Sequence, residues 1–401
     1  MRKLYFFSYF IITNVVYCSA QLQPDTIIAY TIKTGKIDTI LPVSFNSTDT
    51  FAITPFNIGS LGITSLLSQV PPVNNLFTNS MFCDISKADD VFNLSDFPIR
   101  TTTALRYYNS DTAKTSCSGI LVSPNFVLSA GHCVYNYFNQ TFSYYDSLRI
   151  SPSFNNGQEP SNIPGSYAKK IYIFKTFYDK KNFDDIALIE LEEAIGLQTG
   201  WVGIGYSTNF SNYQNKVFHK FSYPAYVHPF DSTRVYNGDT MYYNYGLIDN
   251  LNPNYGVIGA NAAGIPGQSG SSFLYANNND YYSVGVFNFS IYYTHYPISN
   301  HVFYQFQHVL NTTVMSVNEK VKNSSNVLVW PNPFSDEIKV QTKKPGNFVF
   351  SIYNSIGEKI LKQAFEGSFQ SFLLNDLTQG IYFICIEQDN TIITSDKFIK
   401  R

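Results

Sequence analysis

Short runs of apolar residues recur along most of the chain, and turn residues separate them. Residues 117–123 and 126–129 have the pattern of two strands around a Pro-Asn turn, and residues 186–191 form a largely apolar run of strand length. Runs of this length and composition predict β-strands. The pattern therefore predicts an all-β protein.

A second group of short strands fills residues 326–401. Residues 348–353, 380–384 and 397–400 are apolar or alternating, and a turn at residues 354–357 follows the first of them. This pattern predicts a small antiparallel β-sandwich. A carbohydrate-binding or adhesive sandwich is an alternative that the pattern leaves open, because fold class does not fix function.

The first 20 residues have the features of a secretory leader. Arg2 and Lys3 give a positive start, residues 4–17 are mostly apolar, and small residues follow. A membrane anchor is less favoured, because spanning a bilayer takes about 20 apolar residues. Cys18 also permits a lipoprotein signal, although the residues before it match one poorly. We therefore expect an exported protein with residues 1–20 as its signal peptide.

Composition limits the size, charge and class of the protein. The 401 residues are too many for one compact core and suit two or three domains. Hydrophobic residues make up 44% and charged residues only 14%, which excludes a charge-rich disordered chain. Lys and Arg number 27 against 29 Asp and Glu, so the net charge of −2 gives no basic surplus for nucleic acid. The 17% of aromatic residues is in keeping with an exported β-rich protein.

The same patterns predict the domain boundaries. We expect a pro-segment over residues 21–84, where strand-like pieces alternate with a Pro/Asn-rich stretch. The main domain then covers residues 85–315. Residues 316–325 are expected to be a linker, because they adjoin a polar run, and residues 326–401 are the last domain.

A histidine follows the second strand of the predicted hairpin. His132 has small residues before it, so its ring can be held in place while it stays accessible. A lone histidine is more often a core or surface residue. Here Cys117 and Cys133 bracket the hairpin, and a bridge between them would stabilise it by about 3 kcal/mol in the loop-entropy account. Cys83 and Cys385 remain, and the sequence leaves a bridge between these two open.

Two acidic residues stand directly before the apolar run of residues 186–191. The carboxylate of Asp185 can be partly buried there and accept a hydrogen bond from an imidazole, which fixes the tautomer of the ring. By itself this signal is weak, because an aspartate before a strand is commonly a turn residue.

A serine lies in a glycine-rich turn. Gly267 and Gly270 flank Ser269, so its hydroxyl can project while the N–H groups of Gly267 and Ser269 converge as an oxyanion hole. Alone, this segment would be nearly as well explained as an ordinary Gly/Ser loop. The order His132, Asp185, Ser269 differs from the orders found in α/β-hydrolases and subtilisins. The spacings leave room for two β-barrels.

At these residues the chain resembles the trypsin-like serine peptidases, and among them the bacterial glutamyl endopeptidase group. The similarity covers about residues 90–312 and rests on Cys-Ser-Gly-Ile-Leu-Val with Ser-Ala-Gly-His-Cys, on Asp-Ile-Ala-Leu-Ile-Glu-Leu, on a strand ending in Tyr-Pro, and on Gly-Gln-Ser-Gly-Ser. The resemblance implies two six-stranded antiparallel β-barrels of chymotrypsin type. It also implies that Ser269 is the nucleophile, His132 its base, and Asp185 the residue that orients the histidine.

The resemblance indicates a primary substrate pocket as well. Its floor residue would be Ala263, and its wall strand would carry Phe287 and Ser290. Glu-cleaving relatives have a histidine where Phe287 falls, and the floor carries no charge, so we expect cleavage after uncharged residues. His295 lies near enough in sequence to reach the site and reverse this expectation. Gln268 stands where animal relatives carry an aspartate that captures a freed α-amino group, so activation by that ion pair is not expected.

The C-terminal segment resembles the sorting domain of the type IX secretion system of Bacteroidetes. The matching pieces are Pro-Asn-Pro-Phe, Ile-Tyr-Asn before a turn with Gly, Gly-Ile-Tyr-Phe, and the closing Lys-Phe-Ile-Lys. The resemblance implies that the secretion machinery is a partner of residues 326–401. It also implies a final location outside the cell or on its surface, reached through the periplasm.

We therefore expect a secreted serine endopeptidase that hydrolyses protein or peptide substrates through an acyl-enzyme. The alternative is a catalytically inactive surface-binding protein on a peptidase scaffold, and it is disfavoured because the histidine and the serine are both present. No nucleic acid, stable membrane span or cofactor is implied. The other histidines lack the paired spacing of zinc ligands and are expected to be structural: His219, His228, His295, His301 and His308.

Overall fold

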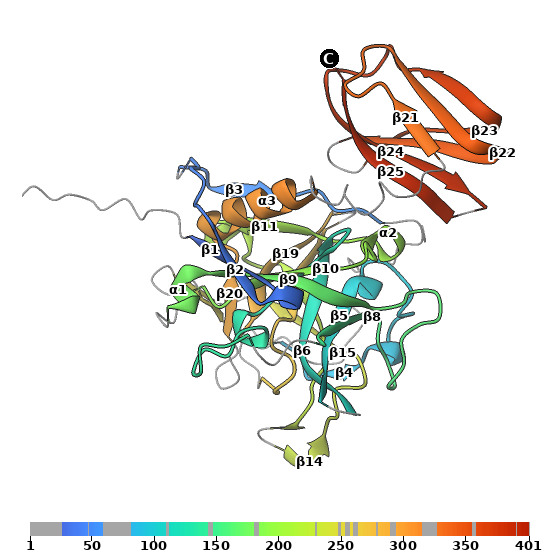
Figure 1. Cartoon of the computed structure of the whole chain (residues 1–401). Helices are drawn as coiled ribbons and strands as arrows, with labels where there is room; N and C mark the ends of the chain where they lie inside the picture. The colour runs from blue at the N-terminus through green and yellow to red at the C-terminus, as the bar shows by residue number, and fades with distance from the viewer. Residues whose placement is uncertain are drawn as a thin grey trace, which may run out of the picture.

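A computed structural model gives the fold of the chain (Figure 1). It describes residues 26–46, 48–58, 82–109, 112–142, 147–179, 184–228, 231–247, 250–252, 257–259, 264–277, 280–288, 294–314, 327–354, 358–389 and 391–400. In this part of the chain, strands predominate, and the helices are α1 (Lys175–Tyr178), α2 (Gly196–Thr199) and α3 (Asn300–Val314). None of these helices is long and apolar enough to cross a membrane. The predicted all-β class is confirmed.

Six antiparallel strands close the first barrel. Their order is β7, β6, β5, β8, β9 and β10, and β10 pairs with both β7 and β9 to complete the ring. Buried apolar side chains, among them Leu121, Val127 and Ile189, fill its interior. The strands are β5 (Thr102–Asn109), β6 (Thr112–Ser123), β7 (Phe126–Ser129), β8 (Arg149–Pro152), β9 (Ser166–Phe174) and β10 (Ala187–Leu191).

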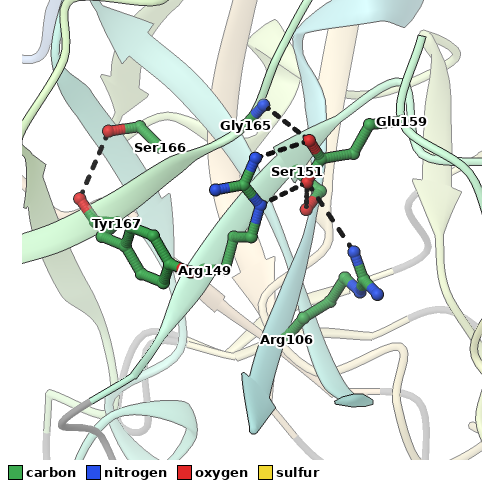
Figure 2. A network of polar contacts seen from close by, with 7 residues as sticks. All are labelled: Arg106, Arg149, Ser151, Glu159, Gly165, Ser166 and Tyr167. Carbon is green, nitrogen blue, oxygen red and sulfur yellow. Dashed lines mark hydrogen bonds and ion pairs between the residues drawn. The ribbon is translucent and has the colours of Figure 1, made fainter. Parts of the chain in front are cut away.

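The loop between β8 and β9 is held to this barrel by one carboxylate (Figure 2). Glu159 accepts hydrogen bonds from Arg149 at 2.6 and 2.7 Å and from Ser151 Oγ at 2.6 Å. The backbone N–H of Gly165 donates at 3.0 Å, and the Arg106 guanidinium lies 3.7 Å away. Burial alone would raise the pKa of Glu159, but these donors lower it to about 2. The charged carboxylate therefore ties β5, β8 and the start of β9 together.

The second unit is a curled half-barrel. Its strands run in the order β16, β17, β20, β19, β18, β12, β15 and β4, and β11 lies beside β19. No pairing among the described residues joins the two ends of this sheet, and β11 meets β19 through only two residue pairs. A closed barrel followed by a curled one agrees with the expected chymotrypsin-like fold. The strands are β4 (Ser86–Lys87), β11 (Gly203–Ser207), β12 (Val217–Ser222), β15 (Tyr242–Leu247), β16 (Asn250–Asn252), β17 (Val257–Gly259), β18 (Ser272–Asn277), β19 (Asp280–Phe287) and β20 (Thr294–Pro297), and a separate hairpin holds β13 (Val227–His228) and β14 (Asp231–Val235).

Part of the predicted pro-segment belongs to this folded body. β1 (Ile27–Thr31) and β2 (Lys36–Ile40) form a hairpin, and β1 also pairs with β9. β3 (Phe51–Ile53) pairs with β11, and it lies near α3 in Figure 1. Residues 26–58 therefore contact both barrels. The predicted signal peptide lies outside the described residues, as does the whole of the predicted linker.

The C-terminal segment has its own sheet and its own core. β22 (Glu337–Asn354) pairs with β21 (Val327–Trp330), β23 (Lys359–Leu373) and β24 (Gly380–Gln388), and β24 pairs with β25 (Thr391–Lys400). Its buried apolar cluster draws only on residues of this segment, and the rings of Phe350 and Phe372 stack at 3.8 Å within it. Lys400, at the end of the closing motif, is buried and donates a hydrogen bond to the Leu374 carbonyl at 3.1 Å.

Candidate active site

His132 lies in a tight turn directly after β7. Its backbone N–H contacts Asp185 Oδ1, and its ring Nδ1 contacts Asp185 Oδ2, both at 2.8 Å. Because an ionised carboxylate only accepts hydrogen bonds, Nδ1 carries the proton and Nε2 is the unprotonated nitrogen of the neutral ring. The His132 side chain remains 37% exposed. The ring is therefore oriented by one carboxylate and stays accessible.

Two opposing effects act on the pKa of His132. Burial lowers it, whereas the charge of Asp185 and its hydrogen bond raise it, and the pKa lies above its ordinary value as a result. The same interactions stabilise an imidazolium, which is the form that a general base takes after it accepts a proton.

A disulfide closes the hairpin beside the histidine. Cys117 and Cys133 are bridged, as the bracketing of the hairpin predicted. These two sulfurs and His132 lie within 4.8 Å of one another, but disulfide sulfurs are not the thiolates that metal ions bind. Cys83 and Cys385 are both free thiols in the structure.

The residue before Asp185 has a different role. Asp184 has a left-handed backbone, with φ 57°, and its carboxylate is directed to other donors. Thr176 Oγ1 donates to it at 2.6 Å, and the Tyr296 hydroxyl of β20 donates to its other oxygen. Asp184 therefore connects the second unit to the loop that carries Asp185. Sequence reasoning missed Tyr296, because nothing in its own segment indicates so distant a partner.

Ser269 lies in a turn between two left-handed glycines. Gly267 has φ 95° and Gly270 has φ 82°, a region that side chains rarely allow. A Cβ at Gly267 would lie 2.4 Å from the Tyr223 carbonyl oxygen, and one at Gly270 would lie 2.1 Å from that of Ser118. Both positions therefore need glycine, for their backbone conformation and for the close approach.

Ser118 of β6 joins this turn to the first barrel. Its N–H donates to the Ser269 carbonyl at 2.7 Å, and its hydroxyl donates to the Gly267 carbonyl at 2.9 Å. The same hydroxyl accepts from the Tyr223 N–H at 2.9 Å, and Ser129 Oγ donates to the Ser118 carbonyl at 2.8 Å. Ser118 is fully buried. The sequence did not mark it, because a serine within a strand has no distinguishing pattern.

The serine turn also approaches the histidine turn. A Cβ at Gly270 would lie 3.0 Å from the backbone nitrogen of Ala130, two residues before His132. Within the described part of the chain, neither the Gly267 N–H nor the Ser269 N–H donates a hydrogen bond. Two free donors beside a serine are what an oxyanion hole requires.

Gln268 braces the turn from inside. Its side-chain oxygen accepts from the Ile265 N–H, and its amide nitrogen donates to Ser222 Oγ, both at 3.0 Å. The side chain is fully buried. The position at which animal relatives carry an aspartate is thus filled by a neutral amide that is hydrogen-bonded to two neutral groups. An ion pair with a freed amino group was not expected here.

The family follows from comparison with known proteins. The profile of the family described as Trypsin matches residues 98–313, which include His132, Asp185 and Ser269. The chain belongs to the trypsin family. The profile described as Secretion system C-terminal sorting domain matches residues 328–401. This trypsin-family chain therefore also carries a type IX sorting tail, and its expected location is outside the cell or on its surface.

Individual relatives of this trypsin-family chain match over short segments. An extracellular metalloprotease of Bacillus subtilis (strain 168) is 32% identical over 117 residues, which are 28% of this chain and 35% of the relative. A glutamyl endopeptidase of Bacillus licheniformis is 30% identical over 120 residues, which are 30% of this chain and 35% of the relative. The aligned part thus spans about a third of each relative. A solved Glu endopeptidase in complex with MPD covers 57% of this chain and 96% of its own, with 20% identity and a TM-score of 0.44.

Only part of the predicted pocket of this trypsin-family chain can be described. Ala263 and Ser290 lie outside the described residues. Phe287 is buried, and its backbone N–H donates to the Ser271 carbonyl at 2.8 Å while its carbonyl accepts from the Gly270 N–H at 2.7 Å. The strand that carries Phe287 is therefore hydrogen-bonded to the two residues that follow Ser269.

His295 lies directly across the sheet from Phe287. The two are register partners on β19 and β20, their ring centroids are 5.1 Å apart, and His295 stacks on Phe273 at 3.4 Å. Burial, together with the charge of Lys220, holds the pKa of His295 well below its ordinary value. His295 is therefore a neutral core residue beside Phe287, the predicted wall residue.

Lys220 is a feature that sequence reasoning missed. It is fully buried on β12, and its Nζ lies 4.4 Å from the centroid of the Phe287 ring. Burial lowers the pKa of Lys220 to about 7. Lys220 shares one face of the strand with Phe218 and Ser222, which are also buried. A lysine on that face is the sequence signal that could have revealed it.

Proposed function

We propose that this chain is an active serine endopeptidase, with Ser269 as nucleophile, His132 as general base and Asp185 as the group that orients the base. The observation that carries the proposal is the two-point contact between His132 and Asp185. The turn around Ser269, fixed between Gly267 and Gly270, supports the assignment of the nucleophile.

The proposed reaction has two halves. Ser269 Oγ attacks the carbonyl carbon of the scissile peptide while His132 Nε2 takes the hydroxyl proton. The resulting oxyanion accepts hydrogen bonds from the N–H groups of Gly267 and Ser269. The C–N bond then breaks, the imidazolium gives its proton to the leaving amine, and an acyl ester remains on Ser269. A water deprotonated by His132 hydrolyses this ester and restores the serine.

A fluorophosphonate probe tests the proposal against the inactive-scaffold alternative. We expect labelling of the wild type and of Ser271→Ala, a control two residues away, but none of Ser269→Ala. A Ser269→Ala/His132→Ala double variant should turn over substrate no more slowly than Ser269→Ala, because residues that act as a unit give non-additive losses. A folded wild type that neither binds the probe nor cleaves peptides would support the inactive alternative.

We also propose that the primary pocket, assigned to Ala263, Phe287 and Ser290, accepts uncharged side chains. Neither the Phe287 ring nor the neutral His295 offers a counter-charge, and burying an unpaired carboxylate costs several kcal/mol. The measurement is kcat/KM on peptides that differ only at the residue before the cut. A strong preference for Glu would contradict the proposal. His295→Ala and Lys220→Met would then show which residue supplies the charge.

The domain boundaries are part of the same proposal. A signal peptide over residues 1–20 and a pro-segment over residues 21–84 precede a peptidase domain over residues 85–315. A linker over residues 316–325 leads to the sorting domain over residues 326–401. The two matched profiles support the last two domains.

A further inference from the structure

We infer that residues 26–58 remain bound to the peptidase after the chain is cut between residues 58 and 82, and that the active enzyme needs them. The inference rests on the proposed function, because "active" here means active as a serine endopeptidase. It differs from the expectation that a pro-segment is released, because here the cut segment stays as a structural part of the enzyme.

β1 extends the sheet of the first barrel along β9. It pairs with β9 from Ile27 opposite Phe174 to Thr31 opposite Lys170, on the edge that β8 leaves uncovered. Ile27, Ile28 and Ala29 are at most 3% exposed. Ile28 lies in the core of the first barrel, whereas Ile27 and Ala29 lie in a core cluster that draws on both units. Release of β1 would expose two hydrophobic cores to water.

β1 also supports the histidine turn. The Tyr30 ring stacks on Phe142 at 4.3 Å, and Phe142 packs on Tyr135 at 4.8 Å. The ring centroids of Tyr135 and Phe177 are in turn 6.1 Å apart. The Phe177 ring lies against Gly131, next to His132. An aromatic chain therefore leads from the N-terminal segment to the residue beside the proposed base.

Two side chains of α3 form hydrogen bonds with the N-terminal segment. The buried side chain of Gln305 binds the backbone of Val43 twice, donating to its carbonyl and accepting from its N–H, both at 3.0 Å. The Tyr304 hydroxyl donates to Asp49 at 2.6 Å. An amide that pairs with both groups of one backbone residue is specific for an extended segment at that place.

The end of the segment closely approaches the backbone of β11. A Cβ at Gly203 would lie 2.3 Å from the Thr54 carbonyl oxygen, so the two backbones are in direct contact. Arg100 is 1% exposed, and its NH2 group donates to the Ile58 carbonyl at 2.6 Å. Without residues 26–58 this buried guanidinium would lose one of its acceptors, which is costly for a charged group.

The bound segment does not close the proposed active site. With residues 26–58 in place, His132 is still 37% exposed and paired with Asp185, and Ser269 is partly exposed. Access for a substrate therefore does not require the segment to leave.

The experiment places a cleavage site for an unrelated, sequence-specific protease between residues 58 and 82 of the full chain. After cutting, we expect the N-terminal fragment to co-elute with the peptidase on gel filtration, and kcat/KM to stay within about twofold of the uncut protein. Urea should release the fragment. Release without urea, or activity that persists after the fragment has been removed, would each overturn the inference.

A matched pair of variants tests the contact on α3. In the cut protein, Gln305→Leu should lower the urea concentration that releases the fragment, whereas Gln307→Leu on the same helix should leave it unchanged. Equal behaviour of the two variants would count against the role of Gln305. Fluorophosphonate labelling of the uncut protein separates the two ideas. If it is absent while the fragment co-elutes, the proposed function fails and the retained segment does not.

Discussion

At the scale of single residues, the proposed site depends on which of two neighbouring carboxylates faces the histidine. Asp185 contacts both the backbone and the ring of His132. The left-handed backbone at Asp184 turns its carboxylate toward Thr176 and Tyr296. The sequence placed an acidic pair at this point, and the backbone conformation separates the two residues by function.

We predict that Asp185→Asn loses about 10⁴-fold in kcat, because the imidazole then loses the acceptor that fixes its tautomer. The matched variant Asp184→Asn should retain kcat within a few-fold and lose about 1 kcal/mol of stability, because Thr176 and Tyr296 keep a weaker acceptor. Steady-state kinetics and urea unfolding of both variants check this. An active Asp185→Asn beside a dead Asp184→Asn would show that the wrong carboxylate has been assigned.

A second residue-scale prediction concerns pH. The proposed base must be neutral, so kcat/KM should rise with pH through the pKa of His132, which Asp185 holds above the ordinary 6.5. In Asp185→Asn the charge that raises this pKa is gone, so the midpoint of the residual activity should move to lower pH. Profiles of kcat/KM from about pH 5 to 9 measure both midpoints. Identical midpoints would mean that the Asp185 charge does not act on His132.

Residues with a local signal were predictable, and residues defined by distant contacts were not. His132, Ser269 and the Cys117–Cys133 bridge stand in short segments whose composition already suggests their surroundings. Ser118 and Tyr296 act through partners more than a hundred positions away, so nothing in their own segments indicates a role.

At the scale of elements, the Glu159 loop shows how one half-buried charge can tie two strands and a loop together. The carboxylate joins donors from β8, from the loop before β9 and, at longer range, from β5 (Figure 2). Its pKa of about 2 lies below the ordinary 4.5, so the charged form is the one that the folded state favours.

We predict that Glu159→Gln lowers the free energy of unfolding by about 3 kcal/mol at pH 7. A carboxylate whose pKa is lowered in the folded state stabilises the fold at pH values above its unfolded pKa. This stabilisation is lost as pH falls from about 4.5 to about 2. The difference in unfolding free energy between wild type and variant should therefore be less than half as large at pH 3 as at pH 7. Urea unfolding at both pH values measures it. The exposed Glu193→Gln serves as control, and a pH-independent gap would rule out the charge as the cause.

The elements themselves were partly predictable. Alternation gave the all-β class and the hairpin before His132, because strand formation there follows a local pattern. The pairing of β1 with β9 brings together residues more than 130 positions apart, and no local pattern specifies such a partner. The same holds for the curled, open form of the second unit, which depends on which strand edges meet.

At the scale of the whole molecule, the sorting domain and the peptidase have separate cores. The buried cluster of residues 334–398 includes no peptidase residue among those described. A domain with its own core can be removed without exposing the other.

We predict that deletion of residues 326–401 leaves a soluble peptidase with unchanged kcat/KM that accumulates in the periplasm. The sorting profile covers nearly all of the deleted segment, so export beyond the outer membrane should stop. Activity assays and immunoblots of periplasmic and culture fractions measure this, with the full-length Ser269→Ala chain, followed by immunoblot, as the export control. Wild-type amounts of the truncated protein in the medium would remove the sorting role.

The bridge between Cys117 and Cys133 also bears on where the structure beside His132 can be completed. Disulfides do not persist in a reducing cytosol, so the newly made chain lacks the covalent closure of the hairpin beside His132. That closure can form only after the chain has crossed the inner membrane. For the proposed peptidase, the covalently closed site would therefore form only outside the cytosol, away from the cytosolic proteins that it could cleave.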